Sequence, residues 1–368
     1  GRAQPRRQRR RQRLRAVQSR DGHHRIGGQR LQPIIIDEFG AFVGKKSERL
    51  QVLKKGELLA EVPLIDLEQV LIASAGVSLS SDVVFECGTR GIPITFLTFA
   101  GEPYATVISA DLTGTVATRR EQLLAYADER GVALAKAFAC GKLANQANLL
   151  RYLSKYRRAA QPDAYRELRE AAAEIQDAAT ELDRLAGTTL DDVRAQIMGV
   201  EGLAAKRYWQ ALRCVVPADL GWPGREHRGA ADLVNCLLNY GYGILYGQVE
   251  RAIVLAGLDP YGGYLHVDRP GKPSLTLDLI EEFRQMVVDR TVLALLGRGS
   301  ELRLDDDGRL DGPTRKSLAD KLFERLDAEE PHEGRRNKLR TIIQMQARHL
   351  ATFVRRERPE YKAWVGRW

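Results

Sequence analysis

Three polar positions in the sequence interrupt apolar patterns and carry side chains that bind divalent metals. Glu201 lies in "IMGVEGLAAKRYW", and His266 follows the loop sequence "LDPYGGYL". Asp278 and Glu281 are three residues apart, so both side chains lie on one face of a helix. Carboxylate oxygens suit Mg²⁺ or Mn²⁺, and an imidazole nitrogen shifts the preference toward Mn²⁺. Together these residues could form a divalent-metal site with open positions.

Each of these residues also has an ordinary structural explanation. A helical glutamate is usually solvated or paired, and Lys206 and Arg207 follow Glu201 closely. A lone histidine beside a loop is more often structural than a metal ligand. Acids near a helix N-terminus commonly compensate the helix dipole. Because 65 and 15 residues separate the three candidate ligands, the sequence alone does not show that they converge.

Basic and aromatic residues around the acids indicate a nucleic-acid substrate. Residues 335–368 carry ten Lys or Arg against two Glu, and Arg348 and Arg355, seven apart, share a helix face. Such clusters bind phosphates, although a solvated helix face has the same composition. The candidate DNA contacts in the sequence are Lys206, Arg207, Arg269, Lys272, Arg284, Arg348 and Arg355.

The overall charge comes almost entirely from one end of the chain. The 368 residues have a net charge of +9, but residues 1–30 hold eleven Arg and one Asp, which leaves 46 basic and 47 acidic residues elsewhere. The body is therefore nearly neutral, so a DNA-binding surface must come from local clustering. The four cysteines form no CxxC pair, which favours reduced thiols in a cytoplasmic protein. No apolar run approaches the roughly 20 residues of a membrane span.

Strand patterns precede helical patterns along the chain, which predicts an α+β fold with segregated domains. We expect a disordered Arg-rich tail or linker at residues 1–32, a β-rich domain at 33–112 and an α-helical domain at 113–368. A hairpin turn is expected at residues 54–57 and a helix capped by Ser80 or Ser81. Thr189 is a candidate N-cap of a further helix. We also predict helices at residues 231–256 and 275–297, connected by a loop at 257–274.

Several longer stretches resemble a known family, the CRISPR-associated integrases of spacer acquisition, or Cas1 proteins. The resemblance covers about residues 33–365, and its most specific parts are "GVEGLAAKRYW", "DLVNCLLNYGYGILYGQVERAIVLAGLDPYGGYLH" and "PSLTLDLIEEFR". "GKLANQANLLR" at 141–151 also resembles a family segment, with Lys142, Asn145 and Gln146 at its polar positions. The Arg-rich residues 1–32 do not resemble the family.

The resemblance implies a catalytic site and a set of partners. The family's metal ligands fall on Glu201, His266 and Glu281, its auxiliary acid falls on Asp278, and Tyr242 matches a position that either supports the site or faces DNA. The implied activity is Mn²⁺- or Mg²⁺-dependent insertion of short DNA into a CRISPR array. The implied partners are double-stranded DNA, a second copy bound through the β-rich domain, the companion protein Cas2 and a trimming nuclease. A non-catalytic nucleic-acid-binding scaffold and a general branched-DNA repair nuclease are the alternatives.

Overall fold

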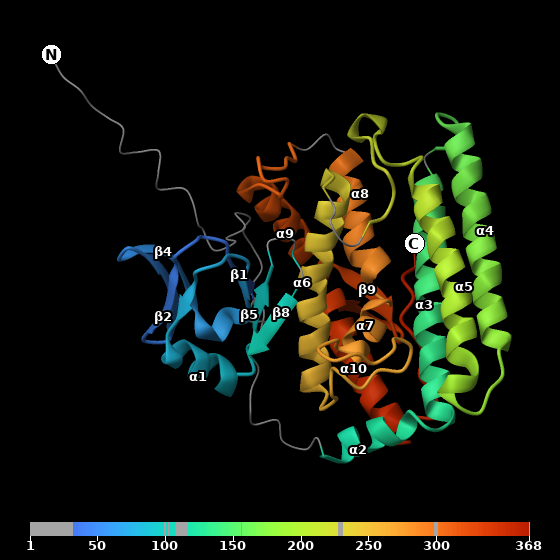
Figure 1. The fold of residues 1–368 in the computed structure, drawn as a ribbon, viewed down its shortest axis with the longest axis horizontal. Helices are drawn as coiled ribbons and strands as arrows, with labels where there is room; N and C mark the ends of the chain where they lie inside the picture. The colour runs from blue at the N-terminus through green and yellow to red at the C-terminus, as the bar shows by residue number, and fades with distance from the viewer. Residues whose placement is uncertain are drawn as a thin grey trace. The chain divides into compact units, whose positions relative to one another are not determined.

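The computed structural model describes residues 32–98, 101, 103–107, 116–155, 157–226, 231–297 and 301–367. The chain divides into two units, Gly1–Asp111 and Leu112–Trp368 (Figure 1). The first unit is rich in strands and the second in helices, which confirms the predicted α+β class. Except for Gln32, the predicted tail or linker at residues 1–32 lies outside the described residues.

Two four-stranded sheets make up the first unit. One sheet has the order β1-β5-β7-β8, with β8 antiparallel to β7 and the other neighbours parallel. Its strands are β1 (Gln32–Ile36), β5 (Leu67–Ile72), β7 (Ile94–Leu97) and β8 (Pro103–Val107). The other sheet has the order β4-β3-β2-β6. Its strands are β2 (Phe42–Lys46), β3 (Arg49–Lys54), β4 (Glu57–Pro63) and β6 (Ser78–Leu79), and η1 (Leu64–Asp66) links β4 to β5.

The local signals predicted for this unit are present. Lys55 and Gly56 both have positive φ, at 50° and 81°, and form the turn of the β3–β4 hairpin. Helix α1 (Ser81–Thr89) begins after Ser80, whose hydroxyl accepts a hydrogen bond from the Val83 amide at 3.3 Å. Apolar side chains from both sheets and from α1 form the buried core of the unit.

The second unit is built from helices and one short hairpin. Helices α3, α4 and α5 pack against one another, and α6 packs on α7, α9 and α10 (Figure 1). None of the described helices is long and apolar enough to cross a membrane. The elements are α2 (Val116–Ala125), α3 (Glu129–Ser154), α4 (Pro162–Arg184), α5 (Leu190–Leu212), η2 (Ala218–Leu220), α6 (Leu233–Leu255), α7 (Ser274–Ile280), η3 (Gln285–Asp289), α8 (Arg290–Gly297), α9 (Gly312–Asp327), β9 (Glu329–His332), β10 (Arg335–Lys338) and α10 (Leu339–Val354).

One predicted helix end is confirmed and one predicted helix is wrong. Thr189 caps α5 in a reciprocal capping box with Asp192. The single helix expected at 275–297 is instead interrupted: α7 ends at Ile280, η3 is a π-helix and α8 follows it. A π-helix widens the turn, and here its last residue is Asp289, whose buried carboxylate accepts hydrogen bonds from two tyrosines. The β9–β10 hairpin was not expected from the sequence either.

The C-terminal segment, residues 355–367, packs along α3 without regular secondary structure. Asn145 donates from Nδ2 to the Trp364 carbonyl at 3.0 Å and accepts from the Gly366 amide at 2.9 Å. The Trp364 ring stacks on Phe283, with centroids 5.4 Å apart. Gly141 makes this approach possible because a Cβ at Gly141 would overlap the Cβ of Ala363. The segment is therefore part of the folded unit.

We expect Gly141→Ala to lower the free energy of unfolding by about 1–3 kcal/mol, the usual cost of overpacking a tight contact. Chemical denaturation measures this change. In the double variant with Ala363→Gly the overlap is gone, so most of the lost stability returns.

Gly199→Ala is the matched control because nothing lies within 4 Å of a Cβ at Gly199 on α5. There, alanine is expected to stabilise by up to about 1 kcal/mol through helix propensity alone. Equal effects at both glycines would contradict the packing of the C-terminal segment against α3.

Candidate active site

A buried carboxylate fixes the loop that carries His266. Asp278 on α7 is fully buried and accepts hydrogen bonds from three successive amides, those of Tyr264, Leu265 and His266, at 2.6, 3.0 and 2.9 Å. Its Oδ1 also lies 2.7 Å from His266 Nδ1. Because this carboxylate accepts from every other partner, the ring proton is assigned to Nδ1, which leaves Nε2 as the nitrogen with a free lone pair.

The same loop is held from its other side by α2. Gln122 is buried, and its Nε2 donates to the carbonyls of Asp259 and Gly262, both at 2.8 Å. Its Oε1 accepts from the Asp259 amide at 2.8 Å, and the Tyr264 hydroxyl donates to the Gln122 carbonyl at 3.0 Å. Gly263 passes against the first residues of α7, where a Cβ would meet Ser274 atoms at 2.6–2.8 Å. His266 is therefore presented by a rigid loop.

Glu201 and Glu281 share one cation, Lys142. The Lys142 ammonium pairs with Glu201 Oε1 and lies 2.8 Å from Glu281 Oε2. These residues come from three helical segments: α3, α5 and the end of α7. Glu281 Oε2 has this charge partner, but among the described residues no hydrogen bond satisfies that buried oxygen. The structure therefore brings together two carboxylates that are 80 residues apart in the sequence.

Arg284 supports Glu281 from the opposite side. Its guanidinium donates to Glu281 Oε1 at 2.7 Å and lies 4.2 Å from the centroid of the Tyr242 ring. The Tyr242 hydroxyl in turn donates to Asp289, which also accepts from Tyr208 at 2.7 Å. These contacts leave Tyr242 only 8% exposed. Of the two roles expected for Tyr242, this burial favours support of the site over contact with DNA: the Tyr242 ring packs against Arg284.

The charges around Glu281 keep it ionised. Burial by itself raises the pKa of Glu281, but Arg284, Lys142 and His266 outweigh it and hold this pKa at about 2. The four predicted catalytic residues therefore form two bonded pairs: Lys142 joins Glu201 to Glu281, and Asp278 is bonded to His266. The charge of His266 contributes to the lowered pKa of Glu281.

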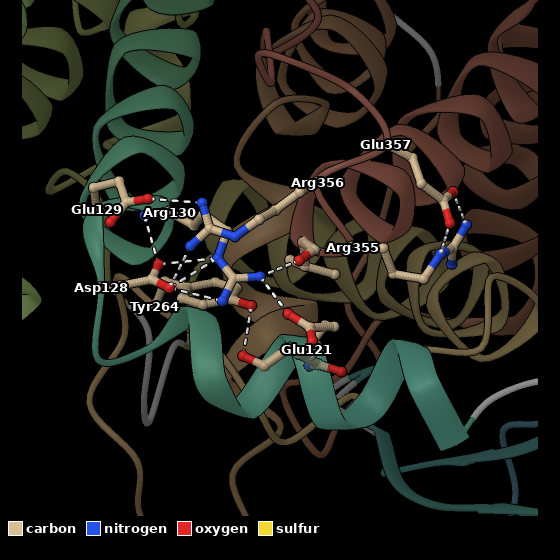
Figure 2. Close-up of polar contacts among 10 residues, drawn as sticks. Glu121, Asp128, Glu129, Arg130, Tyr264, Arg355, Arg356 and Glu357 are labelled. Atoms are coloured by element: carbon tan, nitrogen blue, oxygen red, sulfur yellow. Dashed lines mark hydrogen bonds and ion pairs between the residues drawn. The ribbon is translucent and has the colours of Figure 1, made fainter.

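Besides Arg284, which pairs with Glu281, two predicted DNA contacts have partners within the protein. Arg207 pairs with Glu167 and Glu174 of α4, which holds α5 against that helix. Figure 2 shows Arg355 turned toward Glu357, with the two side chains joined by bonds of 2.8 and 2.6 Å. Arg355 also donates to Thr118 at 2.7 Å. The structure assigns both arginines intramolecular contacts.

Other predicted DNA contacts remain available. Lys206, Arg269 and Arg348 are exposed and Lys272 is half-buried, and within the described part of the chain no carboxylate pairs with any of the four. Met198, Gly199, Gly202 and Leu203 surround Glu201 on an open face of α5, where the glycines have nothing within 4 Å of a Cβ position. A large substrate can therefore approach Glu201.

Two features of the site were missed in the sequence. The first is the role of Lys142, which was identified only as a polar position in a stretch that resembles the family. The second is a depression of about 670 Å³ between α3 and α4, with five cations and two tyrosines in its lining and, among the described residues, no acid. Its lining residues are Asn148, Arg151, Tyr152, Ser154, Lys155, Arg158, Tyr165, Arg169 and Arg367. No single segment contains this cluster, so sequence patterns do not reveal it.

Known proteins resemble this chain over most of its length. The family model described as CRISPR associated protein Cas1 matches residues 34–322. A protein of Archaeoglobus fulgidus named CRISPR-associated endonuclease Cas1 1 is 40% identical over 346 residues, which is 91% of this chain and 99% of that protein. A Rhodospirillum rubrum protein named CRISPR-associated exonuclease Cas4/endonuclease Cas1 fusion is 33% identical over 89% of this chain and 56% of its own length.

A solved structure shows the same fold at lower identity. The structure described as a casposase bound to integration product superposes with a TM-score of 0.77 at 22% identity, covering 90% of this chain and 93% of the other. At this identity the likeness concerns the fold alone. The family match and the Archaeoglobus fulgidus relative together establish that this chain belongs to the Cas1 family of CRISPR-associated proteins.

Proposed function

We propose that this chain is a metal-dependent DNA integrase and endonuclease that inserts short DNA fragments into a CRISPR array. The observation that carries the proposal is that Glu201 and Glu281, from separate segments of a chain of the Cas1 family, share Lys142, while His266 is among the charges that lower the pKa of Glu281. Named relatives are Cas1 endonucleases, and a structural neighbour is a casposase bound to an integration product. A 3′-hydroxyl of the captured DNA would attack a phosphodiester at the repeat boundary. The new phosphorus–oxygen bond would replace the bond to the 3′-oxygen of the neighbouring nucleotide, which leaves and takes up a proton as the attacking hydroxyl loses one.

The donor groups fit a divalent cation. Glu281 presents a buried, ionised oxygen whose partner is the Lys142 ammonium, Glu201 faces the same ammonium, and Asp278 holds Nδ1 of His266, which leaves Nε2 for a ligand. Two carboxylates and one imidazole match the preferences of Mn²⁺ and Mg²⁺. When bound, such an ion would supply Lewis-acid stabilisation of charge on the phosphate oxygens. The Lys142 ammonium now neutralises the carboxylates that would hold it.

The protein's own side chains orient this cluster and balance its charge. Asp278 fixes the ring of His266 through Nδ1, as carboxylates commonly do for metal-binding histidines. Arg284 holds Glu281 Oε1, so only Oε2 is available on the side of Lys142. The open face of α5 gives a DNA backbone room to approach Glu201. These groups place the reacting phosphate; they do not themselves need to exchange protons with it.

We further propose that DNA binds the basic depression between α3 and α4. Its cations suit phosphates, and Tyr152 and Tyr165 provide rings in the same lining. Lys206, Arg269, Lys272 and Arg348 would add contacts elsewhere on the helical unit. Along α3, Lys155 is 13 residues from Lys142, or about 20 Å at the helical rise. DNA reaching both would extend several base pairs from the site.

The proposed partners follow from family membership. They are double-stranded DNA, both as the captured fragment and as the CRISPR repeat, and the companion protein Cas2. A homodimer would form through the strand-rich unit. A trimming nuclease is proposed because a relative is named as a fusion of Cas4 exonuclease and Cas1 endonuclease.

The first test is strand transfer of a short duplex into a plasmid that carries a CRISPR repeat, with Mn²⁺ or Mg²⁺ and Cas2 present. Glu201→Ala is expected to lower the yield of joined product at least about 100-fold, the scale on which one group stabilising transition-state charge acts. Its free energy of unfolding should change by less than about 1 kcal/mol because Glu201 is on the rim of the cluster.

Glu170→Ala, an exposed glutamate on α4, serves as the matched control and should join DNA like the wild type. A folded Glu201→Ala protein with full joining activity would contradict the proposed site.

The second test concerns the basic depression. Arg158→Ala combined with Arg169→Ala should weaken duplex binding and reduce the slope of log affinity against log salt by about two, one for each lost phosphate contact. Fluorescence anisotropy at several salt concentrations gives both quantities.

The double variant Arg166→Ala with Lys321→Ala is the matched control, because it also removes two positive charges. These two cations pair with Asp163 and Glu324 and do not line the depression. This control should leave the slope nearly unchanged. If both double variants shift the slope equally, the effect comes from net charge and the depression is not a binding site.

The third test asks whether Lys142 stands where a metal would act. Lys142→Met leaves the two carboxylates without their shared cation, so the metal-free protein should lose about 3 kcal/mol of unfolding free energy. Arg284 still pairs with Glu281 in this variant, so the loss of unfolding free energy is at the low end of the range for breaking a buried ion pair. Added Mn²⁺ should stabilise this variant more than the wild type, because no ammonium competes with the ion.

Thermal unfolding with and without Mn²⁺ reports this difference without any activity assay. Lys136→Met, on the same helix, removes a lysine that donates to the Asp183 and Leu185 carbonyls, and it should show the wild-type response to Mn²⁺. An identical Mn²⁺ response in all three proteins would argue against a metal between Glu201 and Glu281.

A further inference from the structure

A second group of metal-binding side chains lies away from the Glu201 cluster. His332 ends β9, Glu333 follows it in the turn before β10, and His349 lies on α10. One ligand atom from each of the three lies within 4.8 Å of the others. The hairpin and α10 belong to the same helical unit and adjoin each other (Figure 1). These residues play no part in the strand-transfer site described above.

The hairpin turn presents two of the three ligands. Glu333 and Gly334 have positive φ, at 48° and 77°, which makes a tight turn between His332 and Arg335. Glu333 Oε1 accepts a bond from Arg358 at 2.7 Å, and Oε2 lies 3.6 Å from His349 Nε2. His332 Nε2 is buried and has no hydrogen-bond partner among the described residues. A buried, unpartnered nitrogen beside a second imidazole needs an explanation.

The hydrogen bonds around Gln346 determine which nitrogen of His349 is free. Gln346 Nε2 donates to the Lys362 carbonyl at 2.9 Å and to Glu282 Oε2 at 2.8 Å. A carbonyl only accepts, so the amide nitrogen must be on that side and Gln346 Oε1 faces His349. His349 Nδ1 lies 3.1 Å from that oxygen and therefore carries the proton. Its Nε2 lone pair points toward Glu333, the arrangement of a metal-binding histidine held by an outer hydrogen bond.

The surroundings of the three side chains also suit a metal. Burial lowers the pKa of His332 and of His349 because it disfavours the charged ring. The hydrogen bond from Arg358 lowers the pKa of Glu333, which is therefore a carboxylate. The Glu333 side chain is 43% exposed, so an ion can enter from solvent. Arg358 is 35% exposed and can move away from an incoming cation.

We propose that His332, Glu333 and His349 form a second metal site that binds a Zn²⁺-type transition ion and fastens the β9–β10 hairpin to α10. Two imidazole nitrogens and one carboxylate oxygen suit Zn²⁺ or Co²⁺ better than Mg²⁺, which favours oxygen donors. Zinc–ligand bonds of about 2.0–2.2 Å require the three donors to move closer together by small side-chain rotations. Solvent would complete the coordination at the exposed side.

The test is Zn²⁺ and Co²⁺ binding by metal-stripped, untagged full chain carrying Glu201→Ala, which removes a ligand of the other site. Competition with a chromogenic chelator measures Zn²⁺ affinity and stoichiometry, and Co²⁺ gives visible absorption bands of low-coordinate cobalt. His332→Gln and His349→Gln, each in this background, should each lower affinity at least tenfold, since even outer-shell changes cost 10–100-fold. The Co²⁺ bands should disappear with either substitution.

Glu360→Gln is the matched control, because Glu360 pairs with Lys362 on the surface and lies outside the cluster. It should bind Zn²⁺ with unchanged affinity. Histidines elsewhere in the chain contribute equally to Zn²⁺ binding by every variant. The result is therefore the difference in Zn²⁺ affinity and stoichiometry between each variant and its parent. Equal Zn²⁺ affinity and stoichiometry in the parent and both histidine variants would overturn the proposal, whatever the outcome of the strand-transfer test.

Discussion

The candidate active site depends on one buried carboxylate, that of Asp278. It accepts hydrogen bonds from three successive amides of the loop that carries His266, and it orients the His266 ring. A single side chain therefore joins this loop to α7. Burying an unpaired carboxylate is costly, whereas one that accepts several hydrogen bonds is stable. Because α7 also carries Glu281, the loop conformation and the position of His266 beside Glu281 are set together. A deformable loop would leave that distance undefined.

The second constraint is charge balance around Glu281. Its buried carboxylate stays ionised because Arg284 and Lys142 offset the loss of hydration. Arg284 is itself positioned over the Tyr242 ring, and Tyr242 is fixed by Asp289, the last residue of the π-helical turn. Irregular helix geometry thus serves the site: the wide turn directs Asp289 toward Tyr208 and Tyr242, and the tyrosines provide the surface on which Arg284 rests.

Local features were predictable from the sequence, and long-range ones were not. Ser80, Thr189 and the Lys55–Gly56 turn act through neighbouring residues, so their chemistry is visible in a short window. The candidate ligands Glu201, His266 and Glu281 were identified by type and by resemblance, but their convergence depends on helix packing across 80 residues. Tyr242 appeared available to DNA because nothing in its own segment indicates Asp289 as a partner. The break after Ile280 was hidden because a five-residue π-helical segment is too short to change the apolar pattern of the residues around it.

Glu282 links the active-site turn to the rest of the helical unit. Its carboxylate accepts from Tyr361, from the Trp364 amide and from Gln346, so the residue after Glu281 is bonded to both the C-terminal segment and α10. Burial raises the pKa of Glu282 to about 7, although these donors favour its ionised form. Gln346 also accepts from His349, so one amide contacts both the Glu282 network and the proposed second metal site. The C-terminal segment, α10 and the active-site turn therefore share a single hydrogen-bond network, in which displacement of any member costs a buried polar group its partner.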